Sequence, residues 1–444
     1  MASTPQTPLT APGRIPLIGH TLALLRSPVA MLQSLRGQGD VVVLRLGLRP
    51  VYVVNSTALI HRILVTEADQ YAKGRVFDKT RPFVGNGIAT SEGAFHLRQR
   101  RLMLPAFHRE RLRAYTEVMR EQTLAVTAAW RPGQQIDADR AIYELTSKVT
   151  TRALFHCDAG DRAMAAVQQW LPVFLQGVIQ RAMSPLDGLE KLPTPANRRF
   201  ERARAGLREI VDDIVAVYRA DAQDRGDLLS MLANARDEDT GEPMSHEQLH
   251  DELMTILIAG TETTGTALAW LFHAVGRHPD VEERIHHEID TVLGGRPVTF
   301  DDVPALAYTR QVIFEALRLH TPTWVTMRRT TTAVEHAGVR IPAGAELLFS
   351  PATMHRDPTI YPDAGRFDPD RWEHEPERGT YLPFGAGRHK CIGDHFGLTE
   401  MAVAVATIGA RWRLVPDPGY TVRELPLSTL RPDRLPMTLE SRRP

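Results

Sequence analysis

A loop of glycines and cations surrounds one of the two cysteines in this chain. Cys391 follows Arg388, His389 and Lys390, and glycines stand at positions 385, 387 and 393. The neighbouring cations and a helix expected to begin near Asp394 would both lower the pKa of the thiol, so Cys391 is predicted to be a thiolate. Glycines let such a loop approach a flat ligand closely. Two other interpretations stay open here: a basic surface loop with an incidental cysteine, and a redox-active or nucleophilic cysteine.

A second group of polar residues interrupts the longest apolar stretch. Ala259-Gly260-Thr261-Glu262-Thr263-Thr264 lies inside a long predicted helix, where Gly and Thr lower helix stability unless they have a role. A glycine lets the backbone pass close to a cofactor, and a Thr hydroxyl can bond to the carbonyl one turn earlier and bend the helix. A buried Glu beside a Thr can deliver protons to bound dioxygen. The alternative is a helix contact through small residues, with Glu262 paired to a base.

Two further pairs of residues are weak signals by themselves. Glu315 and Arg318 stand three apart on a predicted helix, as many surface ion pairs do. His96 and Arg100 stand four apart, which puts two cations on one helix face and is typical of a solvated basic surface. Carboxylates of a cofactor would give this arginine a bidentate partner instead.

Taken in order along the chain, these segments resemble the motifs of cytochromes P-450. Phe384-x-x-Gly387-x-His389-x-Cys391-x-Gly393 is similar to that family's haem-binding loop, and the segment 259–264 to its oxygen-activating helix. The resemblance covers nearly the whole chain. It implies a mainly α cytochrome P-450 fold, a large helical unit with a small β-rich portion. This fold would form a single domain over residues 1–444, with a proline-rich lead-in over 1–28.

The resemblance also implies a haem b cofactor (iron protoporphyrin IX) and a role for each matched residue. Cys391 would be the axial ligand to the iron, and Glu262 and Thr263 would be the acid–alcohol pair that supplies protons. The implied structural lock consists of Glu315, Arg318 and Arg371. The other residues implied to contact the haem or its propionates are His96, Arg100, Ala259, Gly260, Arg328 (with Arg329 as the alternative), Phe384, Gly385, His389 and Gly393.

The reaction of that family inserts one oxygen atom from O2 into a substrate and releases the other as water. The chain contains no nucleotide-binding fingerprint, so we expect electrons from a ferredoxin and its ferredoxin reductase, steered by a cationic face. That face is expected to comprise Arg101, Arg109, Arg111, Arg113, Arg388 and Lys390. The expected substrate is small and hydrophobic. Its predicted pocket is lined by Phe83, Val84, Phe174, Ile256, Trp324 and Val325, and also draws on the segment Leu427–Leu430.

The lead-in and the segment Trp324–Arg329 resemble bacterial enzymes that oxidise sesquiterpenes. A terpenoid substrate is therefore expected, with fatty acids, steroids and macrolide precursors as alternatives. Two other kinds of protein would share the cysteine loop: a peroxide-using enzyme or haem dehydratase, and a haem protein that binds a ligand without turnover. The Glu262–Thr263 pair favours the O2-dependent route over both.

The overall composition is that of an ordinary globular protein. Of 444 residues, 43% are hydrophobic, and 53 Lys and Arg balance 53 Asp and Glu, so no global field favours nucleic acid or an anionic membrane. Only two cysteines occur, and we expect Cys157 to be a buried apolar residue and the compartment to be a reducing cytoplasm. We expect no signal peptide. Hydropathy alone would make Leu253–Phe272 a membrane helix, but its polar centre favours a helix inside a globular core.

Helical patterns dominate the elements that must position these residues. The predicted helices are Phe95–Met103, Arg109–Ala129, Ala138–Phe155, Ala163–Ile179, Pro195–Arg225, Leu228–Ala235, Ser245–Val275, Pro279–Leu293, Thr309–Leu319 and His395–Trp412, with a helical pattern from Ser56 to about Ala72. Ser245 and Gln248 predict a capping box at the start of the longest helix. Strands are predicted at Asp40–Leu46, Val51–Val54 and within Thr330–Ala352, which is strand-like with a Pro-Ala-Gly turn. Short strands are also expected after Trp412, and the small β-rich portion is expected to be built from both ends of the chain and from Thr330–Ala352. Because of its Pro and Gly residues, Phe77–Glu92 is predicted to be a loop.

Overall fold

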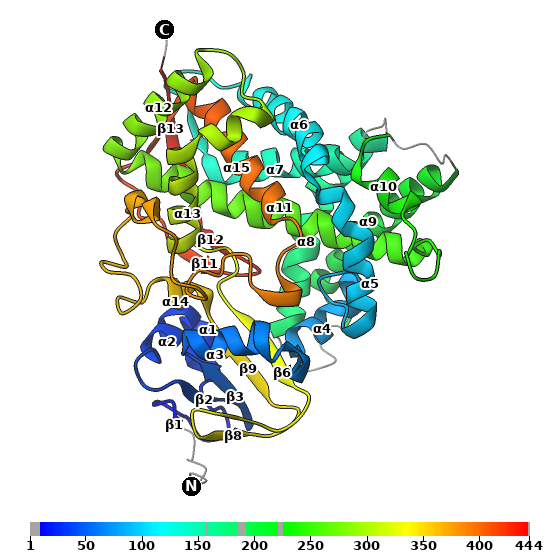
Figure 1. Cartoon of the computed structure of the whole chain (residues 1–444), viewed down its shortest axis with the longest axis vertical. Helices are drawn as coiled ribbons and strands as arrows, with labels where there is room; N and C mark the ends of the chain where they lie inside the picture. Colours follow the sequence, from blue (N-terminus) through cyan, green and yellow to red (C-terminus); the bar gives the residue numbers. More distant parts are fainter. Residues whose placement is uncertain (1–8, 156–158, 184–191, 221–224, 443–444) are drawn as a thin grey trace. The chain divides into compact units, whose positions relative to one another are not determined.

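The computed structural model describes residues 9–155, 159–183, 192–220 and 225–442, and Figure 1 labels its elements. Backbone contacts divide the chain into two units. The first comprises Met1–Asp78, Leu317–Phe367 and Trp372–Cys391. The second comprises Lys79–Ala316, Asp368–Arg371 and Ile392–Pro444. Cys157, predicted to be buried, lies outside the described residues.

The first unit is built on a six-stranded mixed sheet in the order β1-β2-β3-β9-β6-β4. Its strands are β1 (Leu9–Thr10), β2 (Val41–Leu46), β3 (Arg49–Val54), β4 (Tyr71–Lys73), β6 (Thr326–Thr330) and β9 (Glu346–Phe349). β2 and β3 form an antiparallel hairpin, as their β-branched residues predicted. β3 then pairs in parallel with β9. A small hairpin of β7 (Val334–His336) and β8 (Val339–Ile341) completes the strands of this unit that the structure describes.

The first unit also contains several short helices. They are α1 (Thr21–Arg26), α2 (Pro28–Ser34), α3 (Thr57–His61), η1 (Arg62–Thr66), η2 (Ala68–Gln70), α14 (Pro351–His355) and η7 (Gly387–His389). Alternate residues of the strands, such as Val41 and Val43 on β2, form one hydrophobic core with Ile60, Ile63 and Leu64. This core fixes the position of η1, against which the cysteine loop lies.

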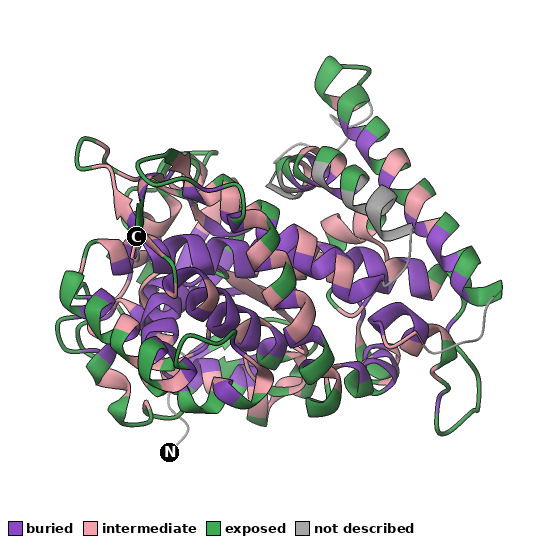
Figure 2. Ribbon diagram, turned by 90° about the horizontal axis from the view of Figure 1, so that it is seen from above, coloured by how far each residue is buried: buried purple, intermediate pink, exposed green. Residues whose placement is uncertain are grey.

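The second unit is mainly helical. Its helices are α5 (Gly93–Met103), η3 (Leu104–Phe107), α6 (Arg109–Thr127), α7 (Ala138–Leu154), α8 (Ala159–Met183), α9 (Pro195–Ala220), α10 (Leu228–Asn234), α11 (His246–Gly276), α12 (Pro279–Leu293), η5 (Phe300–Ala305) and α15 (Asp394–Gly409). The helices α4 (Arg75–Val84) and α13 (Ala307–Leu319) and the short η6 (Pro369–Glu373) contain residues of both units. Helix α11 packs along α7, and α15 along α6. Buried residues, purple in Figure 2, predominate in α11 and α15.

Helix α11 begins as predicted, because Ser245 and Gln248 form the capping box in both directions. Most of its residues from Leu249 to Val275 are buried, including the polar Thr261, Glu262 and Thr264. No helix among the described residues combines the length and apolar character needed to cross a bilayer. The predicted mainly α fold with a small β-rich portion is confirmed for the chain: the long helices lie in the second unit, and the six-stranded sheet lies in the first.

Two predictions about regular structure were wrong. Arg75–Val84 forms helix α4 instead of a loop, with Pro82 in its last turn. Gly85, with φ 82°, follows it in the left-handed conformation that commonly ends a helix, so this glycine marks a terminus and not an irregular segment. Ala352, predicted as strand, belongs to α14.

The terminal strands also differ from expectation. They were predicted to join the N-terminal strands in one β portion. Instead β10 (Trp412–Pro416) and β13 (Pro436–Ser441) pair with β5 (Gln135–Asp137) in a separate sheet. A hairpin of β11 (Glu424–Pro426) and β12 (Leu430–Pro432) lies before β13 in the chain.

Candidate functional site

The cysteine loop of the first unit is closed by its own backbone. Cys391 N donates a hydrogen bond to Phe384 O at 2.9 Å, and Lys390 N donates to Gly387 O at 3.0 Å. Gly385 and Gly387 both have φ 67°, a conformation that favours glycine. The loop therefore turns back on itself and leaves the Cys391 thiol exposed.

Two contacts fix this loop to the η1–η2 segment. Arg388 donates to the Asp69 carboxylate and to the carbonyl oxygens of Ala68 and Tyr71. A Cβ built at Gly387 would overlap the carbonyl oxygen of Leu64, so the loop backbone lies directly against η1. Arg388, predicted as part of a cationic docking face, is thus an anchor of the loop and is paired with a carboxylate.

One face of α11 in the second unit is less buried than the rest of the helix. Ile256, Ala259, Gly260 and Thr263 follow the helical spacing i, i+3, i+4, i+7, and each is partly buried or exposed. Thr263 Oγ1 donates to Ala259 O at 2.6 Å, the bond one turn back that the sequence predicted. The accessible stripe on α11 thus consists of small and apolar side chains with one hydroxyl residue.

Glu262 points away from this stripe into a buried polar cluster. Its Oε1 accepts hydrogen bonds from Ser428 Oγ and, at 3.3 Å, from Thr429 Oγ1, both in the turn between β11 and β12. Burial raises the pKa of Glu262, and the bond from Ser428 and the charge of Arg431 offset part of that rise. The carboxyl group therefore holds its proton to higher pH than an exposed glutamate does.

The packing of α11 against α7 explains why a glycine occupies position 260, which the sequence alone did not indicate. A Cβ at this position would lie 2.8 Å from Thr150 Oγ1 and 2.9 Å from Thr150 Cγ2 on α7. Gly265 stands in the same relation to Thr146, at 2.9 Å from its Oγ1. Both glycines let α11 approach α7 closely, so the predicted approach to a cofactor is not needed to explain Gly260.

The three residues of the predicted lock make different contacts. Glu315 is fully buried, and its Oε1 accepts from Arg371 Nε at 3.1 Å and from Asp368 N at 2.9 Å. Arg318, also fully buried, donates to the carbonyl oxygens of His355 at 2.7 Å, Ala364 at 2.8 Å and Arg366 at 3.0 Å. The Arg318 guanidinium therefore stabilises the backbone conformation of the segment 355–366, because its donors are directed at carbonyl oxygens of that segment.

The residues predicted to hold propionates lie on three elements. His96 and Arg100 stand one turn apart on α5, with His96 buried. Arg328 lies on β6 and is buried, whereas its neighbour Arg329 forms ion pairs with Asp78 at 2.8 Å and Glu346 at 2.7 Å. Arg329 is thus bound to two carboxylates, and Arg328 remains the residue predicted to hold a propionate. The remaining residues of the loop motif are His389, which closes η7, and Gly393, which is the N-cap of α15.

Two predicted pocket residues meet on a third aromatic ring. Phe83 of α4 contacts Phe200 of α9 edge to face at 5.4 Å between centroids, and Phe174 of α8 stacks on Phe200 at 5.5 Å. The Arg181 guanidinium lies 3.6 Å from the centroid of Phe200. Phe174 has no exposed surface, and its ring is packed against Phe200 in the core.

The other predicted pocket residues have some accessible surface or lie close to it. Val84, Ile256 and Val325 are partly buried, and Trp324 is buried with its carbonyl oxygen bonded to Ser350. Sequence reasoning missed Phe200, although the apolar spacing of Phe200, Ala203 and Leu207 in a highly charged helix indicates a buried face.

The comparisons with known proteins agree with these motifs. The family model described as Cytochrome P450 matches residues 9–434. Cyclooctatin synthase of Streptomyces melanosporofaciens is 45% identical over 97% of this chain and 95% of that protein. Pentalenene oxygenase of Streptomyces avermitilis is 39% identical over 98% of both chains. Cyclooctat-9-en-7-ol 5-monooxygenase of Streptomyces melanosporofaciens is 45% identical over 99% of this chain and 96% of that protein.

A solved structure, that of the cytochrome P450DA heme domain, matches this fold with a TM-score of 0.89 and 26% identity. The match covers 99% of this chain and 98% of that one. The family predicted from the cysteine loop is thereby confirmed: this chain belongs to the cytochrome P450 family.

Proposed function

We propose that this protein is a haem-thiolate monooxygenase that oxidises a small hydrophobic terpenoid with O2. The observation that carries the proposal is the exposed Cys391 thiol, presented by a closed loop whose glycines occupy left-handed conformations. We further propose that both units act together as one catalytic domain in the cytoplasm.

The side chains predicted to hold a haem b have the chemistry that this group requires. Cys391 supplies a thiolate donor, and a Cβ at the neighbouring Gly385 would meet no atom within 4 Å, so the loop leaves open space beside it. The stripe on α11 offers Ala259 and Gly260 as a flat surface, and cations for propionates stand at Arg100 and Arg328 with His96 and His389. When bound, the haem supplies the site at which O2 is bound and activated.

Within this proposal the side chains have separate tasks. Cys391 holds the iron, and Thr263 keeps its hydroxyl beside the stripe on α11 through its bond to Ala259 O. Glu262 stores a proton in a buried, hydroxyl-lined site. Glu315, Arg318 and Arg371 have a structural task, because Glu315 accepts bonds from Arg371 and from the backbone, and Arg318 donates to backbone carbonyl oxygens.

The substrate class rests on the relatives. Pentalenene oxygenase and cyclooctat-9-en-7-ol 5-monooxygenase are named for cyclic olefinic substrates, which are apolar or carry a single hydroxyl group. The predicted pocket residues of this chain, Phe83, Val84, Ile256, Trp324 and Val325, are apolar too. We therefore propose a terpenoid hydrocarbon or alcohol, and a sesquiterpene stays a prediction.

We propose that a ferredoxin, reduced by a ferredoxin reductase, supplies the electrons. The cationic face expected for its docking is weaker than the sequence suggested, because Arg101 pairs with Asp239 and Arg113 pairs with Asp301. Charge reversal at Arg109 is therefore the sharper test. It should lower the rate of reduction by ferredoxin and reduce the salt dependence of that rate.

The experiment that tests the function is the CO difference spectrum of the dithionite-reduced protein. A strongly red-shifted Soret band that is lost in Cys391→Ala would support thiolate ligation, and titration with terpenes should then shift the spin state. A band without the red shift, or a protein that takes up no haem, would contradict the proposal. Turnover with peroxide but not with O2 and reduced ferredoxin would favour the peroxide-using alternative, and ligand binding without any turnover would favour the non-catalytic one.

A further inference from the structure

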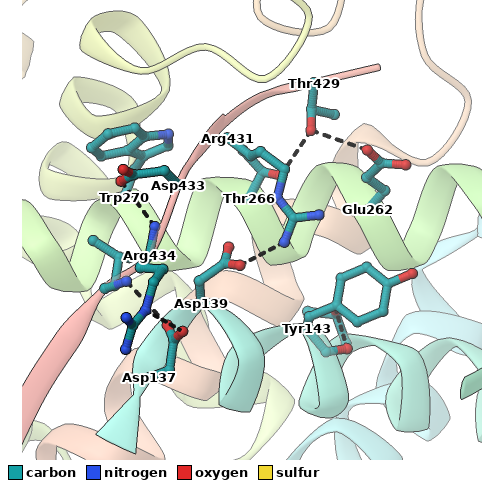
Figure 3. Close-up of polar contacts among 12 residues, drawn as sticks. Asp137, Asp139, Tyr143, Glu262, Thr266, Trp270, Thr429, Arg431, Asp433 and Arg434 are labelled. Atoms are coloured by element: carbon teal, nitrogen blue, oxygen red, sulfur yellow. Dashed lines mark hydrogen bonds and ion pairs between the residues drawn. The ribbon is translucent and has the colours of Figure 1, made fainter. Parts of the chain in front are cut away.

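The turn between β11 and β12 lies beside Glu262 and is held there independently of it. Trp270 Nε1 of α11 donates to Leu430 O at 2.8 Å. The hydroxyl groups of Thr266 and Thr429 lie 3.0 Å apart, and Figure 3 marks this contact with a dashed line. These two contacts fix the hairpin on α11 one and two turns beyond Glu262. The hydroxyl groups that reach Glu262 are thus placed by a rigid support and not by the carboxyl group itself.

The two oxygens of Glu262 have different surroundings. Oε1 accepts from both Ser428 and Thr429, whereas Oε2 is buried and has no hydrogen-bond partner among the described residues. An oxygen that accepts two hydroxyl bonds is the carbonyl-like one, so the proton of the neutral acid belongs on Oε2. Oε1 is therefore the oxygen that faces the two hydroxyl groups, and Oε2 is the oxygen that carries the proton of the neutral acid.

An ion pair between Arg431 and Asp139 lies near Glu262. Arg431 of β12 donates to the Asp139 carboxylate of α7 at 2.5 Å, so the cation next to Glu262 is already paired (Figure 3). Burial raises the pKa of the Tyr143 phenol on α7, and the charge of the nearby Glu262 raises it further. Arg431 lowers and Asp139 raises the pKa of Glu262 through their charges, whereas Tyr143 is a phenol whose own pKa is raised by Glu262. Because Asp139 opposes Arg431, the site does not force the acid to ionise.

Ser428 connects this buried site with accessible space. Its residue is exposed, whereas Thr429 and Glu262 are buried. Ser428 is thus the one of the two hydroxyl donors to Glu262 that water can reach. Thr429 is buried and already contacts Thr266 and Glu262.

We propose that Ser428, Thr429 and the Arg431–Asp139 pair form a holding site that positions the Glu262 carboxyl, with Ser428 as the hydroxyl through which water returns protons to it. This inference rests on the proposed function, because it concerns how Glu262 regains the proton that it gives up in the oxygen chemistry. After Oε2 has given up its proton, Ser428 Oγ passes its proton to Oε1 and takes one from water. A half turn of the carboxyl group then restores the starting state. One proton moves in each cycle, and no electron is transferred.

The test is a pH titration of the Glu262 carboxyl in the ferric holoenzyme by infrared difference spectroscopy, with Glu262→Gln to assign its band. Ser428→Ala removes a bond that favours the ionised form, so it should raise the midpoint, by on the order of one pH unit. Asp139→Asn leaves Arg431 unopposed and should lower the midpoint. Thr421→Ala, at an exposed hydroxyl residue ahead of the same hairpin, is the matched control and should leave the midpoint unchanged.

A second measurement distinguishes a proton-relay role of Ser428 from a purely structural one. Ser428→Ala should divert a larger share of the O2 consumed into hydrogen peroxide at unchanged KM, and Ser428→Thr, which keeps the hydroxyl, should restore coupling. Midpoint shifts in the same direction for Ser428→Ala and Asp139→Asn, or unchanged coupling in Ser428→Ala, would overturn the inference. Failure of the proposed function itself is recognised separately, because all variants would then lack the red-shifted CO band.

Discussion

Gly260 of α11 lies so close to Thr150 of α7 that a Cβ at position 260 would stand 2.8 Å from the threonine hydroxyl oxygen. Thr150 is itself buried, so its short side chain has little room to move. The relation makes position 260 sensitive to a single methyl group.

The first prediction concerns this contact. Gly260→Ala should destabilise the protein by roughly 1–3 kcal/mol through overpacking, although alanine favours the helix by about 1 kcal/mol. In a Thr150→Ala background the next atom is the Cβ of residue 150 at 3.4 Å, an ordinary contact, so the same substitution should become neutral or stabilising. Urea unfolding of the four proteins in this cycle measures the coupling. Equal losses in both backgrounds would show that the two side chains do not compete for space.

The second prediction separates two glycines of the cysteine loop. Gly385 and Gly387 share φ 67°, so an alanine at either position is strained by roughly 1–2 kcal/mol. Only at Gly387 would the new Cβ also overlap the Leu64 carbonyl, whereas at Gly385 it meets no atom within 4 Å. Gly387→Ala should therefore lower the free energy of unfolding by clearly more than Gly385→Ala does. Urea unfolding of the two variants measures this difference, and equal losses of stability would contradict the role of the η1 contact.

The sequence predicted the long helices well because their apolar positions recur with the helical period over many turns. Helix α11 was found with its capping box, since Ser245 and Gln248 carry a local signal. Helix α4 was missed because Pro82 and Gly85 were taken as signs of a loop, although a proline near the end and a glycine after it are compatible with a helix that stops there.

The site could be predicted only as far as its motifs reach. Cys391, Glu262 and Thr263 stand in short patterns, but the partners of Glu262 come from a turn 166 residues later in the chain, where a serine and a threonine have no distinctive spacing. The same limit explains the overestimated cationic face. Arg388 pairs with Asp69, 319 residues away, and charge counting along the sequence cannot detect such a pair.

The third prediction concerns the buried guanidinium of Arg318. Lysine keeps the charge but cannot direct donors at the carbonyl oxygens of His355, Ala364 and Arg366 together. Arg318→Lys should cost several kcal/mol, because buried acceptors lose their partners and a compact ammonium is left in their place. Lys148→Arg, at an i,i+4 surface pair with Glu144, is the contrasting variant and should change stability by less than about 0.5 kcal/mol. Equal melting temperatures of Arg318→Lys and the wild type would show that the three carbonyl contacts are not needed.

The last prediction uses a histidine that the fold keeps neutral. His355 is completely buried, and its Nε2 accepts from Leu382 N at 2.9 Å, so the ring cannot be protonated there without losing this bond. Burial, with the nearby charge of Arg318, lowers the pKa of His355 from 6.5 to about 3. As the pH falls, His355 therefore takes up a proton near pH 6.5 in the unfolded chain but only near pH 3 in the folded chain. The stability that this histidine contributes is complete above pH 6.5 and is lost as the pH falls toward 3, by up to about 1.4 kcal/mol per pH unit.

His355→Gln offers Leu382 N an amide oxygen in place of the ring nitrogen and has nothing to titrate. Its free energy of unfolding in urea should fall less steeply than that of the wild type between pH 6.5 and 4. The exposed His374→Gln serves as the matched control and should keep the wild-type slope. Identical slopes in all three proteins would mean that His355 takes up its proton in the folded state as readily as in the unfolded one, and the bond from Leu382 would then not hold the ring neutral.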